Sequence, residues 1–181
     1  FVKDGKTYGI PKDFSTLALY YNKDMFTKAG LPEPKDKMTW EEFVDLSKKL
    51  TKGDVVGFGG NFDLARLKYA AEATGSKIET ADGKPNFTDP EVIKAIKQFI
   101  DMHTAKTLVT AEEKGAGWPG DLLGTGKVAM VMEGPWIQPF LAQNFKDLKY
   151  GVVEMPLTAG KPGTAAYTVS LGINADSKNK V

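Results

Sequence analysis

Apolar residues are arranged along parts of the chain in patterns typical of β-strands. Residues 17–22 alternate Leu17, Leu19 and Tyr21 with Ala18 and Tyr20, and all five are apolar or aromatic. Residues 128–132 form a continuous apolar run, which suits a strand buried on both faces. Further strands are expected over residues 7–10, 55–59, 150–155 and 165–173.

Helix start signals lie between these segments. Thr39 and Glu42 form a capping box, in which each residue bonds the backbone of the other, and they predict a helix beginning there. Thr88, Asp89, Pro90 and Glu91 predict a second start, with proline in the first turn. The buried positions expected on these two helices are Phe43, Val44, Leu46 and Leu50, and Val92, Ile93, Ile96, Phe99 and Ile100.

Weaker patterns predict four more helices. One covers residues 23–28 and ends at Gly30, a residue suited to a helix C-terminus. The others cover residues 64–74, 121–126 and 135–144, and the first of these has Leu64 and Leu67 among its candidate buried positions. Residues 108–118 are expected to form a loop. Helices that alternate with strands indicate an α/β protein.

The end of the apolar run at residues 128–132 is the most informative place in the sequence. Glu133, Gly134 and Pro135 break the strand, and Pro135 is acceptable at the start of a following helix. Trp136 then lies at the mouth of a strand-to-helix turn. In open α/β sheets, ligands bind outside the carboxyl ends of the strands. Trp136 therefore either stacks on a ligand or is a further core tryptophan, and the residues alone leave both readings open.

Composition excludes several functions. The 181 residues include 41% hydrophobic and 26% charged residues and carry a formal net charge of +1, which is typical of a globular protein and gives no reason to expect nucleic acid or an anionic membrane as partner. The sequence has no cysteine and one histidine, His103, so disulfides and a thiolate zinc site are excluded and no metal site is expected. No apolar run approaches the ~20 residues that span a bilayer.

Six short motifs occur in order along nearly the whole chain. They are residues 8–11 (YGIP), 19–24 (LYYNKD), 39–42 (TWEE), 126–130 (GKVAM), 133–136 (EGPW) and 172–174 (GIN). This series resembles the extracellular solute-binding proteins of bacterial ABC sugar importers, in the branch that includes the maltose- and maltodextrin-binding proteins. The resemblance implies a lobe like that of type II periplasmic binding proteins, in which a central mixed sheet is flanked by helices and joined by hinge-crossing strands.

The resemblance also implies a division of the chain. Residues 1–16 would contain a hinge-proximal strand and the crossing between two lobes, residues 17–166 a ligand-binding lobe, and residues 167–181 a strand returning to the hinge. Family members are about twice this long, so the second lobe is expected to lie outside these residues.

The function implied by the resemblance is non-covalent sugar binding. The protein would hold a malto-oligosaccharide or another di- or oligosaccharide, without a cofactor, and deliver it to the membrane subunits of an ABC transporter. The expected location is extracellular, in the periplasm or on the cell surface as a lipoprotein. The sequence does not reveal which sugar is bound.

The resemblance assigns Trp136 to the stacking role, because sugar rings present faces of C–H groups to aromatic rings. Asp13 or Ser15 would carry a polar contact on the crossing segment; the family's acidic position falls on Ser15, so which residue bonds the sugar stays open, and a loop-capping role for Asp13 is the alternative. Further candidates are Asn61, Phe62, Asp63 and Arg66 after a glycine turn, Trp118 on a glycine-rich loop, and Tyr167 near the return strand.

Three of these further candidates have a structural alternative. Arg66 fits a solvated helix face equally well, Trp118 a hydrophobic plug over a helix end, and Tyr167 packing within a sheet. His103 is expected to be structural, near the end of the long helix.

Two other classes of function are weighed against transport. A carbohydrate-active enzyme or esterase would need an opposed carboxylate pair or an activated serine, and neither motif is present. A sensor or adhesion module would use the same lobe and would share its sequence features.

Overall fold

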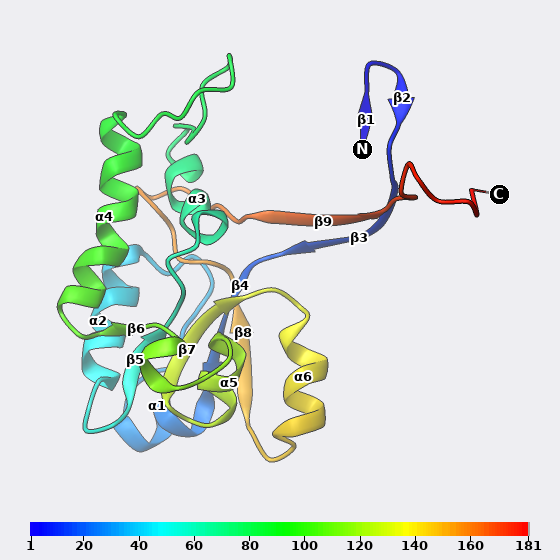
Figure 1. Ribbon diagram of the computed structural model, residues 1–181. Coiled ribbons are helices and arrows are strands. Elements are labelled where there is room, and N and C mark those ends of the chain that lie inside the picture. Colours follow the sequence, from blue (N-terminus) through cyan, green and yellow to red (C-terminus); the bar gives the residue numbers. More distant parts are fainter. Residues whose placement is uncertain (181) are drawn as a thin grey trace.

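The computed structural model describes residues 1–180. Its main body is a five-stranded sheet in the order β6-β5-β7-β4-β8, with helices on both faces (Figure 1). The strands are β4 (Ala18–Asn22), β5 (Val56–Gly59), β6 (Leu108–Val109), β7 (Val128–Glu133) and β8 (Tyr150–Val153). Strands β6, β5 and β7 run parallel, and β4 runs antiparallel to both β7 and β8. The sheet is therefore mixed, as expected.

The helices begin and end largely where capping chemistry predicts. They are α1 (Lys23–Ala29), α2 (Trp40–Leu50), α3 (Leu64–Ala73), α4 (Pro90–Thr104), the 3-10 turn η1 (Glu112–Lys114), α5 (Pro119–Gly124) and α6 (Ile137–Asn144). Both halves of the capping box between Thr39 and Glu42 are formed at α2. Gly30 ends α1 in the left-handed region, at φ 66°. Both signals are confirmed.

Two hydrophobic clusters cover the two faces of the sheet. Leu19 and Tyr21 of β4 point into the cluster that holds α2, α3 and α4, while Tyr20 points into the cluster that holds α5 and α6. Every residue of β7 is buried, which confirms the prediction of a strand covered on both faces. Helix α2 lies so close to β5 that a Cβ on Gly57 would stand 2.0 Å from the Ser47 carbonyl oxygen.

A long two-stranded ribbon leaves this body (Figure 1). Strand β3 (Ile10–Thr16) pairs antiparallel with β9 (Ala166–Leu171), with a register shift between Pro11 and Asp13. A small hairpin of β1 (Val2–Lys3) and β2 (Lys6–Thr7) precedes it, turning at Asp4 and Gly5. The ribbon exposes large apolar side chains, among them Ile10, Phe14, Val169 and Leu171.

Several expectations from the sequence are wrong in detail. Residues 7–10 do not form one strand, because β2 ends at Thr7 and β3 begins at Ile10. Helix α4 buries Val92, Ala95, Phe99 and Met102, and Ile93 and Ile100 are about half exposed. Leu64 is likewise exposed at the first turn of α3. The expected loop at residues 108–118 contains β6 and η1.

Candidate functional site

Strand β7 ends at a buried carboxylate next to a half-exposed indole. Glu133, its last residue, is fully buried, and Gly134 and Pro135 then turn the chain so that Trp136 caps helix α6. The Trp136 side chain stays 37% exposed. Its ring nitrogen Nε1 donates to Glu133 Oε2 at 2.8 Å. The indole is therefore held at its edge by an internal acceptor.

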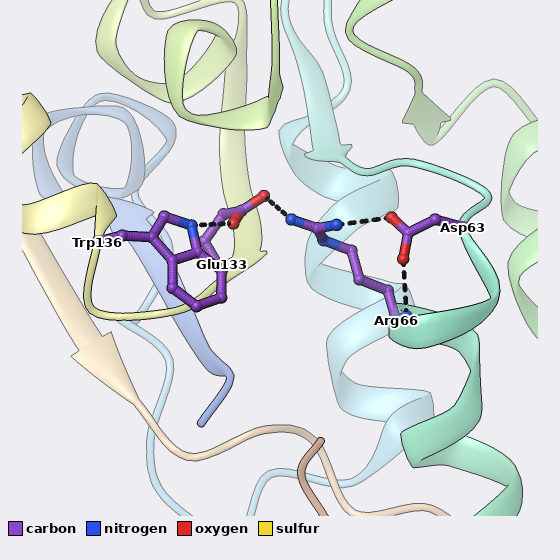
Figure 2. A network of polar contacts seen from close by, with 4 residues as sticks. All are labelled: Asp63, Arg66, Glu133 and Trp136. Carbon is purple, nitrogen blue, oxygen red and sulfur yellow. Dashed lines mark hydrogen bonds and ion pairs between the residues drawn. The ribbon is translucent and has the colours of Figure 1, made fainter. Parts of the chain in front are cut away.

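The amino end of α3 reaches the same carboxylate (Figure 2). Asp63 caps α3 by accepting from the Arg66 backbone N–H at 2.9 Å. Arg66 then extends its Nη1 to Asp63 Oδ2 at 2.6 Å and its Nη2 to Glu133 Oε1 at 2.7 Å. Arg66 is the only arginine in the sequence. A planar guanidinium has donors on two sides, so it is suited to bridging two carboxylates.

Burial and the neighbouring charges have opposite effects on the pKa values of Glu133 and Arg66. Burial raises the pKa of Glu133, and Arg66 and the Trp136 N–H partly offset that rise. Burial lowers the pKa of the Arg66 guanidinium, but the charges and hydrogen bonds of Glu133 and Asp63 outweigh it and leave the pKa raised. A buried carboxylate without such a partner would be strongly destabilising. Arg66 is therefore the group that allows Glu133 to be buried.

Tyr167 brings the β3–β9 ribbon to the same place. Its ring meets the Trp136 ring edge-on, with centroids 5.5 Å apart and planes at 83°. Burial raises the pKa of the Tyr167 hydroxyl. Among residues 1–180, the Tyr167 hydroxyl and Arg66 Nε are buried without a hydrogen-bond partner. Two polar atoms at this junction are thus unsatisfied by the part of the chain that the structure describes.

The other predicted residue of the ribbon neighbours Tyr167. Ser15 lies opposite Tyr167 in the strand register, and Asp13 lies opposite Val169. Because alternate residues of a strand share a face, Asp13, Ser15 and Tyr167 project on the same side of the ribbon. Asp13 is exposed and pairs with Lys12 at 3.1 Å.

Asn61 and Phe62 lie between β5 and the Asp63 cap. Asn61 is half-buried, whereas Phe62 is exposed and packs edge-on against His103 at a centroid distance of 5.2 Å. His103 also bonds Glu113, with 2.9 Å between Nε2 and Oε1. Asn61 and Phe62 are therefore close in sequence to Asp63 but take no part in the Arg66–Glu133 network.

Trp118 lies in a different environment. It caps α5, packs against the Phe140 ring at 4.8 Å between centroids, and covers Gly120 so closely that a Cβ there would stand 2.3 Å from the indole. It is half-buried and borders the cluster under α5 and α6. The structure brings together Asp63, Arg66, Trp136 and Tyr167, with Ser15 and Asp13 on the adjoining face; it does not join Trp118 to them.

The sequence analysis missed the role of Glu133, which it treated only as the residue that breaks the strand. The available signal was a carboxylate directly after a buried apolar run and three residues before a tryptophan. Its partner Arg66 is 67 residues away in the sequence, so no local pattern could pair them.

Across residues 1–180, no group of three or more His, Cys, Asp or Glu side chains is arranged to hold a metal ion. No helix in that range is both long enough and apolar enough to cross a membrane.

The carboxyl end of a strand in an α/β sheet, with an aromatic ring beside fixed polar groups, is a place where proteins of this class bind ligands. A family model described as bacterial extracellular solute-binding protein matches residues 1–181. The chain belongs to this family of bacterial extracellular solute-binding proteins.

Individual relatives agree. The chain is 34% identical over 189 residues to a binding protein of Brucella abortus, which covers 99% of this chain and 45% of the relative. It is 32% identical over 193 residues to the galactooligosaccharide-binding protein of Bacillus subtilis, covering 98% of this chain and 43% of the relative. The chain therefore spans less than half the length of these curated relatives.

Solved structures confirm the fold class. An ABC substrate-binding protein of Listeria monocytogenes in complex with cycloalternan superposes with a TM-score of 0.83 at 26% identity, over 99% of this chain and 47% of that one. An ABC transporter solute-binding protein of Thermotoga lettingae bound with α-D-tagatose gives a TM-score of 0.78 at 27% identity, over 99% and 48%. The fold is that of type II periplasmic sugar-binding proteins.

Proposed function

We propose that this chain forms one lobe of a protein that binds an oligosaccharide outside the cell and delivers it to the membrane subunits of an ABC transporter. The observation that carries the proposal is the half-exposed Trp136 indole at the carboxyl end of β7, with its N–H bonded internally. Trp136 keeps more than one-third of its surface exposed at the strand end, and sugar rings pack their C–H faces on exposed aromatic rings of this kind.

The proposed contacts follow from the arrangement around Trp136. Trp136 takes the apolar face of a sugar ring, and Tyr167 borders it. Asp63, Arg66 and Ser15 supply polar groups for hydroxyls, with Asn61, Asp13 and Phe62 at the margin. Trp118 contributes a second platform at most at a distant part of the ligand, because it packs on α5 and Phe140. Malto-oligosaccharides are the first ligands to test.

The division of the chain is part of the proposal. Residues 17–166 form the ligand-binding lobe, and the strands in residues 1–16 and 167–181 cross toward a second lobe. The coverage of less than half of each relative supports this reading. Closure of two lobes around the ligand by hinge motion would then create the form that the transporter recognises.

The proposed location is the periplasm or the cell surface, the latter as a lipoprotein. The family description as extracellular supports the coarser part of this statement. Binding is non-covalent, and the protein catalyses no chemical step and needs no cofactor.

The test is calorimetric titration of the full-length gene product with malto-oligosaccharides, galacto-oligosaccharides, trehalose, sucrose and xylo-oligosaccharides. We expect micromolar binding of one sugar, weakened at least about tenfold (~1.4 kcal/mol) by Trp136→Ala. Phe87→Ala is the matched control, because Phe87 is a similarly exposed aromatic in the loop before α4.

Absence of binding to every sugar would overturn the proposed ligand class. Equal affinity of Trp136→Ala and the parent protein would remove the stacking role. Equal losses in the Trp136 and Phe87 variants would show that the effect is not specific to this site.

A further inference from the structure

Glu133 is the least expected group at the site. It is fully buried at the end of β7, and both of its oxygens are occupied, Oε2 by the Trp136 N–H and Oε1 by Arg66 Nη2 (Figure 2). Because the whole side chain is buried, neither oxygen is exposed to a ligand. The carboxylate therefore acts on the site only through the groups it holds.

The Trp136 N–H does not need this partner for its own satisfaction. The residue is more than one-third exposed, so an indole released from Glu133 could turn its N–H toward water. Using a buried carboxylate in place of water as the acceptor of the indole N–H destabilises the fold, unless the carboxylate is itself paired with a cation. Unlike water, the carboxylate fixes the direction of the hydrogen bond from the indole. A single donor bonded to a rigid strand end sets the plane of the ring.

Two further contacts restrict the same ring. Tyr167 meets it edge-on from β9. Gly134 makes room for the ring, because a Cβ at that residue would stand 2.2 Å from Trp136 Cζ3. The six-membered part of the indole thus lies directly against the backbone that leads out of β7. An indole held at its nitrogen, against the Tyr167 ring and along its benzene ring has little rotational freedom.

Arg66 completes the arrangement from α3. By pairing with Glu133 while also held by Asp63, it ties the carboxylate to the amino end of a second element. The position of the indole therefore depends on a chain of four side chains from β7, α3 and the turn before α6.

We propose that Glu133 is the positioning residue of the sugar site: it fixes the plane of the Trp136 indole, with Arg66 as its counter-charge, and does not itself touch the ligand. Because the ring N–H is used internally, the ligand is recognised at this point through the ring face alone. This inference rests on the proposed function, and its test has a readout that does not require a ligand.

The first readout is the indole N–H resonance of Trp136 in a ¹H–¹⁵N spectrum, assigned by its loss in Trp136→Phe; three tryptophans lie in this chain. In the full-length protein we expect slow exchange of this proton with water. Glu133→Ala is expected to speed that exchange at least tenfold and to weaken sugar binding about tenfold or more. Glu133→Gln keeps an oxygen acceptor, so we expect partial rescue of both quantities.

Two further variants separate positioning from general destabilisation. Gly134→Ala crowds the ring without changing any charge, and it is expected to lose affinity as Glu133→Ala does. Met130→Ala, at another fully buried position of β7, is expected to lower the melting temperature yet leave the Trp136 resonance and the sugar affinity within about twofold.

The outcomes are distinguishable. An unchanged Trp136 exchange rate in Glu133→Ala overturns the positioning role, whether or not a sugar is found. Unchanged affinity in a variant whose indole has been released also overturns it. If Glu133→Ala does not fold, the Trp136 N–H exchange rate and the sugar affinity of Glu133→Gln and Gly134→Ala test the positioning role instead. A parent protein that binds no sugar, with its indole still protected, overturns the proposed function and leaves the positioning of Trp136 supported.

Discussion

The five-stranded sheet and the β3–β9 ribbon hold their apolar side chains in opposite ways. In the sheet, Phe58 of β5 is 1% exposed and packs edge-on against Phe43 of α2. In the ribbon, Phe14 of β3 is 71% exposed. Backbone pairing joins the strands in both regions, so pairing does not distinguish them. The difference is the presence of helices over the sheet, and it shows that side-chain burial in the main body supplies the stability that the ribbon's apolar residues do not.

Tyr167 is the exception on the ribbon. It is half-buried, contacts Trp136, and lies near Arg66 and Glu133 closely enough for their charges to act on its hydroxyl. The site is therefore built where the two regions meet. Its parts come from a rigid sheet end, a helix start and one strand of a largely uncovered ribbon.

The largest expected difference between the regions comes from a matched pair of phenylalanines. Phe58→Ala should lower the free energy of unfolding by about 3–5 kcal/mol, because it leaves a cavity in the core. Phe14→Ala should change it by less than about 0.5 kcal/mol. Urea denaturation of both variants measures the two values. Similar losses would mean that the ribbon face is covered in the protein in solution.

The junction between the regions is tested next by Arg66→Met. Removing the cation leaves Glu133 buried and unpaired, which should destabilise the protein at neutral pH by about 3 kcal/mol. The pKa of Glu133 is already raised by burial, and losing Arg66 raises it further. Protonation then relieves the penalty, so the deficit relative to the parent protein should shrink as the pH falls through that raised pKa.

Thermal or urea unfolding of the Arg66→Met variant from neutral to mildly acidic pH gives the measurement. Lys97→Met is a suitable control, because Lys97 pairs with Asp101 on the exposed surface of α4. A deficit that does not depend on pH would contradict the assignment of the loss to an unpaired Glu133 carboxylate.

Substitutions of two residues on the same face of β9 should differ less in their effect on the free energy of unfolding. Tyr167→Ala removes the edge-on contact with Trp136 and should lower the free energy of unfolding by roughly 1–2 kcal/mol. Val169→Ala, two residues along the strand and half exposed, should lower it by less than about 0.5 kcal/mol. Equal effects would show that Tyr167 does not anchor the ribbon to the main body.

The smallest effect concerns an exposed group of the main body. The backbone N–H of Thr110 and the side chain of His103 lower the pKa of Glu113 to about 2 from an ordinary value of 4.5. Its stabilising contribution is therefore complete above pH 4.5 and is lost as the pH falls toward 2.

Glu113→Gln should accordingly lower the urea midpoint slightly at pH 6 and leave it unchanged near pH 2. Glu112→Gln, the exposed neighbour, is the control. A difference that persists at the acid end would contradict the charge-based account. A small value would also sharpen the comparison of the two regions, since it shows that exposure sets the effect even within the main body.

Local chemistry explains which parts of this structure were predictable from sequence. The capping box at Thr39 and Glu42, the end of α1 at Gly30, and the buried run of β7 each depend on residues within a few positions of one another. Each was predicted correctly. The position of Trp136 after β7 also followed from local chain-breaking residues.

Features that depend on distant partners were not predictable in the same way. Ile93 and Ile100 looked like core residues of α4, but its neighbours cover the face that carries Ala95 and Met102. Arg66 fitted a solvated helix face equally well, and only the approach of α3 to β7 pairs it with Glu133. Burial of a carboxylate cannot be inferred without its counter-charge, and the counter-charge here lies on another element.

The pairing of β3 with β9 joins two segments that the ribosome makes at well-separated times. The Thr168 hydroxyl donates to the Asp13 carbonyl across 155 residues of chain. During synthesis β3 emerges 155 residues before its partner in β9, and its apolar side chains stay uncovered until β9 has been added. Contacts of such long sequence separation form slowly, because a large loop must close first. Strand β3, which pairs beside Tyr167, therefore stays unprotected for a long interval, and a chaperone that binds extended apolar segments would find its target there.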